Sequence, residues 1–263
     1  MAEERRVSPA SDYDQFVDWD KRLGREEALF RWAFAIAGAN SVIDVGAGSA
    51  RHSIMFARWG MRVDAVDPDA SMLAQAETNI AAAADSVAVS GGEIHLLTGG
   101  FGQLASLGLG PADALVCTGN ALPHVEGHQG LRETLADFAA VVRPGGVLVL
   151  HLLNHARLLD SHPRVIPPVL RDTAEGTKVF LRVIDYPAGE EFLDFDFLTL
   201  VRDPDGEWDL THRRSPHTAL PLSVLREELM AAGFGHLEAF GSHDRAPFDE
   251  QKDESIIVMA RRI

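Results

Sequence analysis

The sequence has one cysteine and no long apolar run, and both features exclude classes of protein. Cys117 is the only cysteine in 263 residues, so no disulfide can form within the chain and a reducing compartment is expected. No apolar stretch reaches the roughly 20 residues of a membrane-spanning helix. The first residues, MAEERRVSPASDYDQ, are charged where a signal peptide needs an apolar core. We therefore expect a cytoplasmic protein with no membrane partner.

Basic residues are also scarce. The chain has 24 Lys and Arg against 39 Asp and Glu, which gives a net charge of −15. Its basic clusters are no longer than pairs such as Arg213-Arg214 and Arg261-Arg262, which are too short to follow a phosphate backbone. The expected partner is therefore a small molecule, with no nucleic acid.

Hydrophobic residues make up 46% of the chain, enough for one α/β domain with an insertion. From residue 41 onward, short apolar runs alternate with helical stretches. This alternation predicts a doubly wound parallel α/β sheet that binds ligands beyond the carboxyl ends of its strands. The predicted strands are 41–45, 62–66, 94–97, 114–117 and 147–152, and the helices between them are 51–59, 70–84 and 131–142.

The flanks of this core follow other patterns. Residues 12–37 have a helical pattern, whereas Pro163, Pro167 and Pro168 indicate a loop. Three strand-like runs follow without helices between them, at 178–186, 192–202 and 208–217, and they predict an antiparallel meander. A helix at 221–232 and strands at 236–240 and 255–260 complete the chain. We expect an N-terminal helical lid (1–40), a ligand-binding core (41–152), a loop and meander over the active site (153–220), and a C-terminal helix with the final core strands (221–263).

The segment SVIDVGAGSARHSIMFARWG, residues 41–60, is an apolar strand that ends in a glycine turn and enters a helix. Gly46 and Gly48 let backbone approach a ligand closely, and the helix start offers unpaired amide hydrogens. Asp67, about 20 residues beyond the turn, is placed to accept both hydroxyls of a ribose. Arg51 replaces the third glycine of the dinucleotide fingerprint, which disfavours a pyrophosphate, and Asp44 can approach a ligand ammonium group. The pattern favours a nucleoside that carries an amino acid.

These features resemble class I S-adenosylmethionine (SAM)-dependent methyltransferases, through DVGAG at 44–48, AVDPDASML at 65–73 and RPGGVLVL at 143–150. The resemblance implies a Rossmann-like, mostly parallel sheet with its last strand antiparallel, an antiparallel β insertion, and SAM as cofactor. It places the predicted cofactor contacts at the glycine turn and after the next strands. These contacts are Asp44, Gly46, Ala47, Gly48, Arg51, Asp67, Pro68, Met72, Gly100, Phe101 and Thr118.

The resemblance also implies a role for each part of this set. Asp44 and the turn backbone hold the methionine part of SAM, Asp67 holds the ribose, and Pro68 and Met72 flank the adenine. Gly100 stands where the family has Asp or Asn, so a side-chain acceptor for the adenine amino group is missing. Phe101 still offers its backbone amide and a stacking surface.

VCTGNALPHVEG at 116–127 and YDQF near the N-terminus resemble the glycine N-methyltransferase group more narrowly. The resemblance implies that Asn120 and His124 line the acceptor pocket and take part in catalysis. Asn154 also matches that group, but Leu153 replaces the arginine that grips the carboxylate of glycine, so glycine is not the expected acceptor. Arg157, one helical turn away, is predicted to substitute in part.

The N-terminal helix has two interpretations. As the resemblance implies, Tyr13, Trp19 and Arg22 fold over SAM as a lid, with Arg22 or Arg25 holding the methionine carboxylate. In the alternative, the same residues only pack on the sheet.

The histidines do not predict a metal site. No pair among them has tight ligand spacing with a carboxylate partner, so none of them is expected to bind a metal. They are His124, His151, His155, His212, His217 and His243.

The predicted function is SAM-dependent methyl transfer to a small molecule, with an amine nitrogen other than that of glycine as the leading acceptor. Displacement at a sulfonium methyl needs an aligned nucleophile rather than a covalent one from the protein, and His124 could take the proton of an amine. Three alternatives stay open: an O- or C-methyltransferase of a natural-product pathway, a SAM-binding protein without catalysis, and a nicotinamide oxidoreductase.

Overall fold

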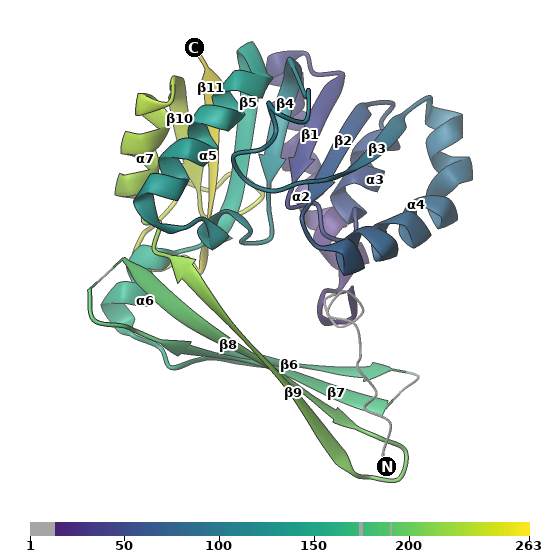
Figure 1. Ribbon diagram of the computed structural model, residues 1–263, viewed down its shortest axis with the longest axis vertical. Coiled ribbons are helices and arrows are strands. Elements are labelled where there is room, and N and C mark those ends of the chain that lie inside the picture. Colours follow the sequence, from purple (N-terminus) through teal and green to yellow (C-terminus); the bar gives the residue numbers. More distant parts are fainter. Residues whose placement is uncertain (1–13, 174–175, 190) are drawn as a thin grey trace.

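The computed structural model describes residues 14–173, 176–189 and 191–263, and two β-sheets dominate it (Figure 1). The larger sheet has seven strands: β1 (Ser41–Val45), β2 (Arg62–Asp67), β3 (Glu93–Thr98), β4 (Ala112–Cys117), β5 (Val142–Leu153), β10 (Phe234–Phe240) and β11 (Ser255–Arg262). Their order across the sheet is β10-β11-β5-β4-β1-β2-β3. The first five strands pair in parallel, and β11 pairs antiparallel with β5 and β10. The predicted fold class is therefore confirmed.

Helices cover both faces of this sheet, and alternate strand residues reach the two layers (Figure 1). On one face, Val42 of β1 packs in a core with Phe30 and Phe56, and on the other Ile43 packs with Phe138. The first layer holds α2 (Trp19–Ala37), α3 (Arg51–Ala57) and α4 (Ala70–Ser90), and the second holds α5 (Gly127–Val141) and α7 (Leu222–Ala231).

The N-terminal helical pattern is interrupted. Residues 14–16 are helical as the pattern predicts, but the helix does not run on without a break, because α2 begins at Trp19. Asp18 has non-helical dihedral angles, and its side chain accepts a hydrogen bond from the Lys21 amide at 3.2 Å. An aspartate in this position satisfies an amide that the first turn leaves unpaired.

The second sheet has four strands: β6 (Val165–Thr173), β7 (Gly176–Asp185), β8 (Phe192–Arg202) and β9 (Trp208–Thr218). The predicted loop at Pro163 to Pro168 is wrong in part, because β6 begins at Val165. A proline is tolerated in an edge strand, and the pairing of β6 with β7 shifts register between Ile166 and Val169, at the two prolines. The short helix α6 (His155–Ser161), which the sequence pattern did not predict, connects β5 to this sheet.

The second sheet lies across the carboxyl end of the first, as Figure 1 shows. Residues that follow β2 and β4 and the last residues of β5 line one cavity together with residues of β7, β8 and β9. The insertion therefore covers the edge where a doubly wound sheet binds its ligands.

Among the described residues, no helix has both the length and the apolar character needed to cross a membrane. The cytoplasmic location and the absence of a nucleic-acid partner stay predictions.

Candidate functional site

The glycine turn joins three strands at one point. The amides of Gly46 and Ala47 both donate to the carbonyl of Val66 at the end of β2, at 2.9 and 3.1 Å. Gly46 has φ +71°, and a Cβ built there would lie 2.8 Å from the Cβ of Ala121, which follows β4. Ala50 at the start of α3 has φ +60°, so the turn continues in a left-handed conformation where no glycine is present. The close approach explains why the turn needs glycine at 46.

Asp67 is buried beside this turn. Its Oδ2 accepts the Gly48 amide at 2.8 Å and its Oδ1 accepts the Asp69 amide at 2.9 Å. Burial raises the pKa of Asp67, while the two backbone hydrogen bonds oppose that shift. A carboxylate oxygen has two lone pairs, so each oxygen can still accept a ribose hydroxyl. Met72 lines the neighbouring cavity, and exposed Pro68 follows Asp67 directly.

Asp44 lies in the interior, below the turn. It is 1% exposed, and the Ser53 hydroxyl donates to its Oδ2 at 2.6 Å. Burial raises the pKa of Asp44. The carboxylate therefore orients the strand-to-helix connection from within, and its contact with the methionine part of SAM stays a prediction.

A polar network that the sequence analysis missed connects the end of β4 to α2. Thr118 Oγ1 lies 3.5 Å from His52 Nδ1, and His52 Nε2 lies 2.5 Å from Glu26 Oε2. Arg22 Nε donates to Glu26 Oε1 at 2.9 Å. Burial alone would raise the pKa of Glu26, but the hydrogen bond and charge of His52, with the charge of Arg22, hold it well below its usual range. Glu26 lies three residues before buried Leu29 on the same helix, and this spacing could have indicated that the glutamate faces the interior.

The same glutamate lies among histidines. Ligand atoms of Glu26, His151 and His243 all lie within 4.8 Å of one another, a donor set that could hold a metal ion. Tertiary contacts thus assemble a group that the sequence spacing did not indicate. Arg22 already donates to this carboxylate, so a metal would share it with a guanidinium. The absence of a metal stays a prediction.

The N-terminal segment is tied to the glycine turn through Asp14. This carboxylate pairs with Arg51 at 2.8 Å and accepts hydrogen bonds from Ser49 and from Trp19 Nε1. Arg51, a predicted cofactor contact, is therefore engaged with the N-terminal segment. Trp19 reaches the turn through the same carboxylate, and Arg22 lines the cavity. Tyr13 lies outside the described residues.

Asn120 and His124 follow β4. The Asn120 side-chain oxygen accepts the Leu153 amide at 2.9 Å, and its Nδ2 lies 3.4 Å from Nδ1 of His217 on β9. The His124 and His217 rings are 4.5 Å apart. Burial lowers the pKa of His217 to about 2, and burial with the charge of Arg213 lowers the pKa of His124. The structure brings the two predicted residues together and adds His217 to them.

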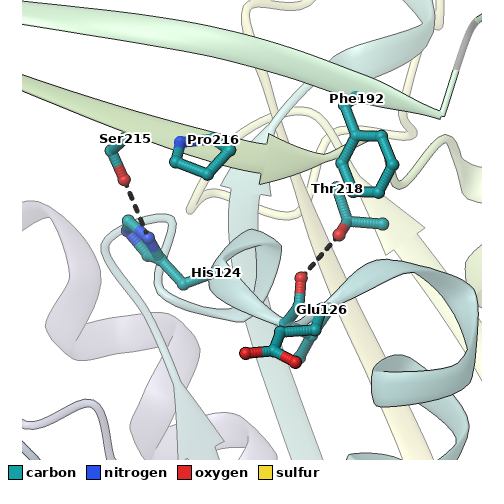
Figure 2. Close-up of a pocket in the computed structure, with 7 residues that line it drawn as sticks. His124, Glu126, Phe192, Ser215, Pro216 and Thr218 are labelled. Atoms are coloured by element: carbon teal, nitrogen blue, oxygen red, sulfur yellow. Dashed lines mark hydrogen bonds between the residues drawn. The ribbon is translucent and has the colours of Figure 1, made fainter.

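A smaller hollow of about 480 Å³ lies beside His124. Figure 2 shows the side chains that line it. His124 Nδ1 lies 3.2 Å from the Ser215 hydroxyl of β9. The Thr218 hydroxyl donates to the Val125 carbonyl at 2.6 Å and accepts the Gly127 amide at 3.0 Å. These bonds attach the segment after β4 to the second sheet and fix the place of His124.

Asn154 and Arg157 take other places. The Asn154 side chain caps α6 by accepting the Arg157 amide at 3.2 Å, and it donates to the carbonyls of Glu250 and Asp253 at 2.7 and 2.9 Å. Neither Asn154 nor Arg157 is among the residues that line the large cavity. The placement gives Asn154 a structural role and does not support the predicted substrate contacts of either residue.

Gly100 and Phe101 follow β3. The Gly100 amide donates to the side-chain oxygen of Gln103 at 2.9 Å, and the Phe101 ring lies 6.2 Å from that of Phe138. The Phe101 ring is therefore held by the core. A Cβ at position 100 would meet its nearest atom, in Pro68, only at 3.8 Å, so the fold does not require glycine there.

One cavity of about 790 Å³ lies beside part of this site, at Met72, Gly119, Asn120 and His124, while Asp67 and the glycine turn are not among the residues that line it. It extends from Met72, Gly119 and Asn120 to the inner face of the second sheet, where Phe180 and Phe195 lie. The volume falls in the range of ~300 to 1,000 Å³ typical of small-molecule sites.

Comparisons with known proteins identify the type of core. Residues 42–146 match the family described as a methyltransferase domain. A curated glycine/sarcosine N-methyltransferase from Parasynechococcus marenigrum (strain WH8102) is 30% identical over 149 residues, which are 57% of this chain and 50% of that protein. The chain spans between a quarter and about half of the length of the first curated relatives that it matches.

Solved structures share the fold over almost the whole chain. A SAM-dependent methyltransferase from Clostridium acetobutylicum ATCC 824 superimposes with a TM-score of 0.76 and 14% identity, over 96% of both chains. An amino pentose methyltransferase from Micromonospora echinaspora superimposes with a TM-score of 0.68 and 18% identity, over 99% of both chains. At these identities the likeness confirms the fold, the second sheet included.

Proposed function

We propose that this chain, whose core is that of a class I SAM-dependent methyltransferase related to the glycine N-methyltransferase group, methylates a small-molecule amine other than glycine. The observation that carries the proposal is the single cavity, which extends from the cofactor side of the core at Met72 and Gly119 to the second sheet. A site for transfer between two bound molecules requires both to share one enclosed space.

The residues around the glycine turn fit SAM. Asp67 keeps a free lone pair on each oxygen, and a Cβ built at Gly48 would meet its nearest atom, the Met72 sulfur, only at 3.9 Å. When bound, SAM supplies a methyl group that is attached to a positively charged sulfonium sulfur. Once the methyl group is transferred, the sulfur remains as a neutral thioether, so the leaving group needs no protonation. The protein then has to align the acceptor and exclude water.

The residues beside β4 suit the acceptor. Asn120 is held by the Leu153 amide and His217, so its position is fixed before an acceptor enters. A lowered pKa keeps the His124 ring neutral near pH 7, and a neutral imidazole can take a proton from an ammonium group. We assign His124 the removal of the amine proton and Asn120 the positioning of the nitrogen.

Glycine is disfavoured as the acceptor. Leu153 stands where the related group has its carboxylate-binding arginine, and Arg157 does not line the cavity. A nitrogen acceptor is supported by the names of the relatives, which include N-methyltransferases and an amino pentose methyltransferase.

The test combines binding with turnover. The midpoint temperature of thermal unfolding should rise with SAM and with S-adenosylhomocysteine (SAH). NAD, as a matched control, should leave this temperature unchanged. A panel of amines, alcohols and carbon acids with methyl-labelled SAM should give product with an amine. Product from an alcohol or a carbon acid would move the assignment to O- or C-methylation. Binding of SAH without any product would favour a non-catalytic SAM-binding protein, and absence of any shift would refute the cofactor.

A further inference from the structure

The inner face of the second sheet carries a row of two arginines and one aromatic ring. Arg182 of β7 pairs with Phe197 of β8, and Phe197 pairs with Arg213 of β9. Paired residues of neighbouring antiparallel strands share a face, and all three line the cavity. The Arg213 guanidinium lies 4.9 Å from the centre of the Phe197 ring. The row therefore places one phenyl ring between two arginines, Arg182 on one neighbouring strand and Arg213 on the other.

The opposite face of the same strand differs in its charge balance. Arg214 follows Arg213 on β9 and pairs with Asp194 at 2.7 Å, and it also lies within 4.0 Å of Asp185 and Asp196. Within the described part of the chain, Arg182 and Arg213 have no such carboxylate partner. The outer face is neutralised by its own acids, and the cavity face is not.

Arg182 is half-buried, with its guanidinium 5.3 Å from the centre of the Phe16 ring of the N-terminal segment. Burial lowers the pKa of Arg182, and Glu254 acts in the opposite direction without forming an ion pair. Removing a cation from water without an anionic partner is costly. A ligand that brings a negative group would remove this cost.

The cavity as a whole also has an excess of positively charged side chains. Six cationic and three acidic side chains line it, although the chain carries a net charge of −15. Two of the acids, Asp18 and Asp69, already cap helices. The cations are Lys21, Arg22, Arg25, Arg171, Arg182 and Arg213. An excess of one charge in a cleft attracts ligands of the opposite charge.

We propose that the methyl acceptor carries a phosphate or a carboxylate group, which Arg182 and Arg213 bind while Phe197 packs against the adjoining part of the molecule. This inference rests on the proposed function and names its substrate class. A guanidinium presents paired donors that match either anion. The charge of Arg213 reaches His124 and His217, so the anion site and the transfer site belong to one acceptor pocket. The two arginines lie on the second sheet, whereas Leu153 is the last residue of the core strand β5.

The test measures anion binding to the SAH complex by calorimetry, with inorganic pyrophosphate and with glutarate as separate probes. Wild type should bind at least one of them. Arg182→Gln and Arg213→Gln should each weaken that binding about tenfold or more, and the double variant should abolish it. Arg214→Gln removes the same charge from the opposite face and should bind the anion as wild type does.

The outcomes distinguish a failure of the anion site from a failure of the proposed function. Binding of pyrophosphate alone indicates a phosphorylated acceptor, and binding of glutarate alone a carboxylate. If neither anion binds wild type, or if the double variant binds as tightly as wild type, the inference is overturned. All variants should keep the wild-type affinity for SAH; if a glutamine variant loses it, Arg182→Lys or Arg213→Lys replaces that variant. If wild type itself fails to bind SAH, the proposed function fails instead.

Discussion

Replacement of Asp67 tests the placement of the cofactor. The two oxygens of this carboxylate accept the amides of Gly48 and Asp69, and each oxygen keeps a lone pair that can accept a ribose hydroxyl. Asp67→Ala should remove one or two charge-assisted hydrogen bonds to the ribose, about 1.5 to 3 kcal/mol each, so that the Kd of SAH rises at least about tenfold. Asp67→Asn should also weaken SAH binding. The side-chain NH₂ group of asparagine is a donor, and it would face either the Gly48 or the Asp69 amide, which is also a donor.

Calorimetric titration with SAH measures both variants, and urea unfolding shows that each remains folded. Asp64→Asn is the matched control, because Asp64 is a buried acid of the same strand that bonds to His95 at 3.0 Å, away from the turn. It should leave the SAH affinity unchanged. If Asp67→Ala binds SAH as tightly as wild type does, the ribose is not at Asp67 and the reasoning from the glycine turn is refuted.

Three further predictions concern the turn, the interior and the acceptor pocket. Gly46→Ala should abolish SAH binding and lower the free energy of unfolding, because the new methyl group meets Ala121 at 2.8 Å at a positive φ. Gly24→Ala, where nothing lies within 4 Å of the added methyl group, is the control, and equal effects of the two substitutions would contradict this reasoning. Burial lowers the pKa of His155 to about 4, whereas in the unfolded chain its pKa is near 6.5, so the unfolded chain binds one more proton between these values. The free energy of unfolding should therefore fall by about 2 kcal/mol as the pH is lowered from about 7 to about 5. Urea titrations of His155→Asn should lose this part of the pH dependence. Asn120→Ala should reduce turnover more than SAH affinity, and equal losses would move this residue to the cofactor side.

Much of the core was predictable because its signals are local. The alternation of apolar runs and helical stretches follows from burial between two helix layers, and it predicts the parallel sheet. The glycine turn and Asp67 follow from conformational and hydrogen-bonding needs within one strand-turn-helix unit. The structure places β8 at Phe192–Arg202, the range that its alternating pattern predicts.

The local signals do not show where a neighbouring segment uses the same residues. The prolines before β6 indicate a loop, but an edge strand tolerates them. Arg51 matches a position near the cofactor, yet Asp14 of the N-terminal segment pairs with it. Asn154 matches a family position, and the helix cap and a distant loop use its hydrogen bonds.

The sequence by itself determined the core fold, the glycine turn and the acid beside it, because these depend on residues close together along the chain. Only the tertiary structure decided what surrounds the acceptor. Asn120 meets His217 across 97 residues of chain, and the row of Arg182, Phe197 and Arg213 exists through strand register alone. Register and packing between distant segments leave no periodic trace in the sequence, so the chemistry of the acceptor pocket depends on the second sheet and its place over the first.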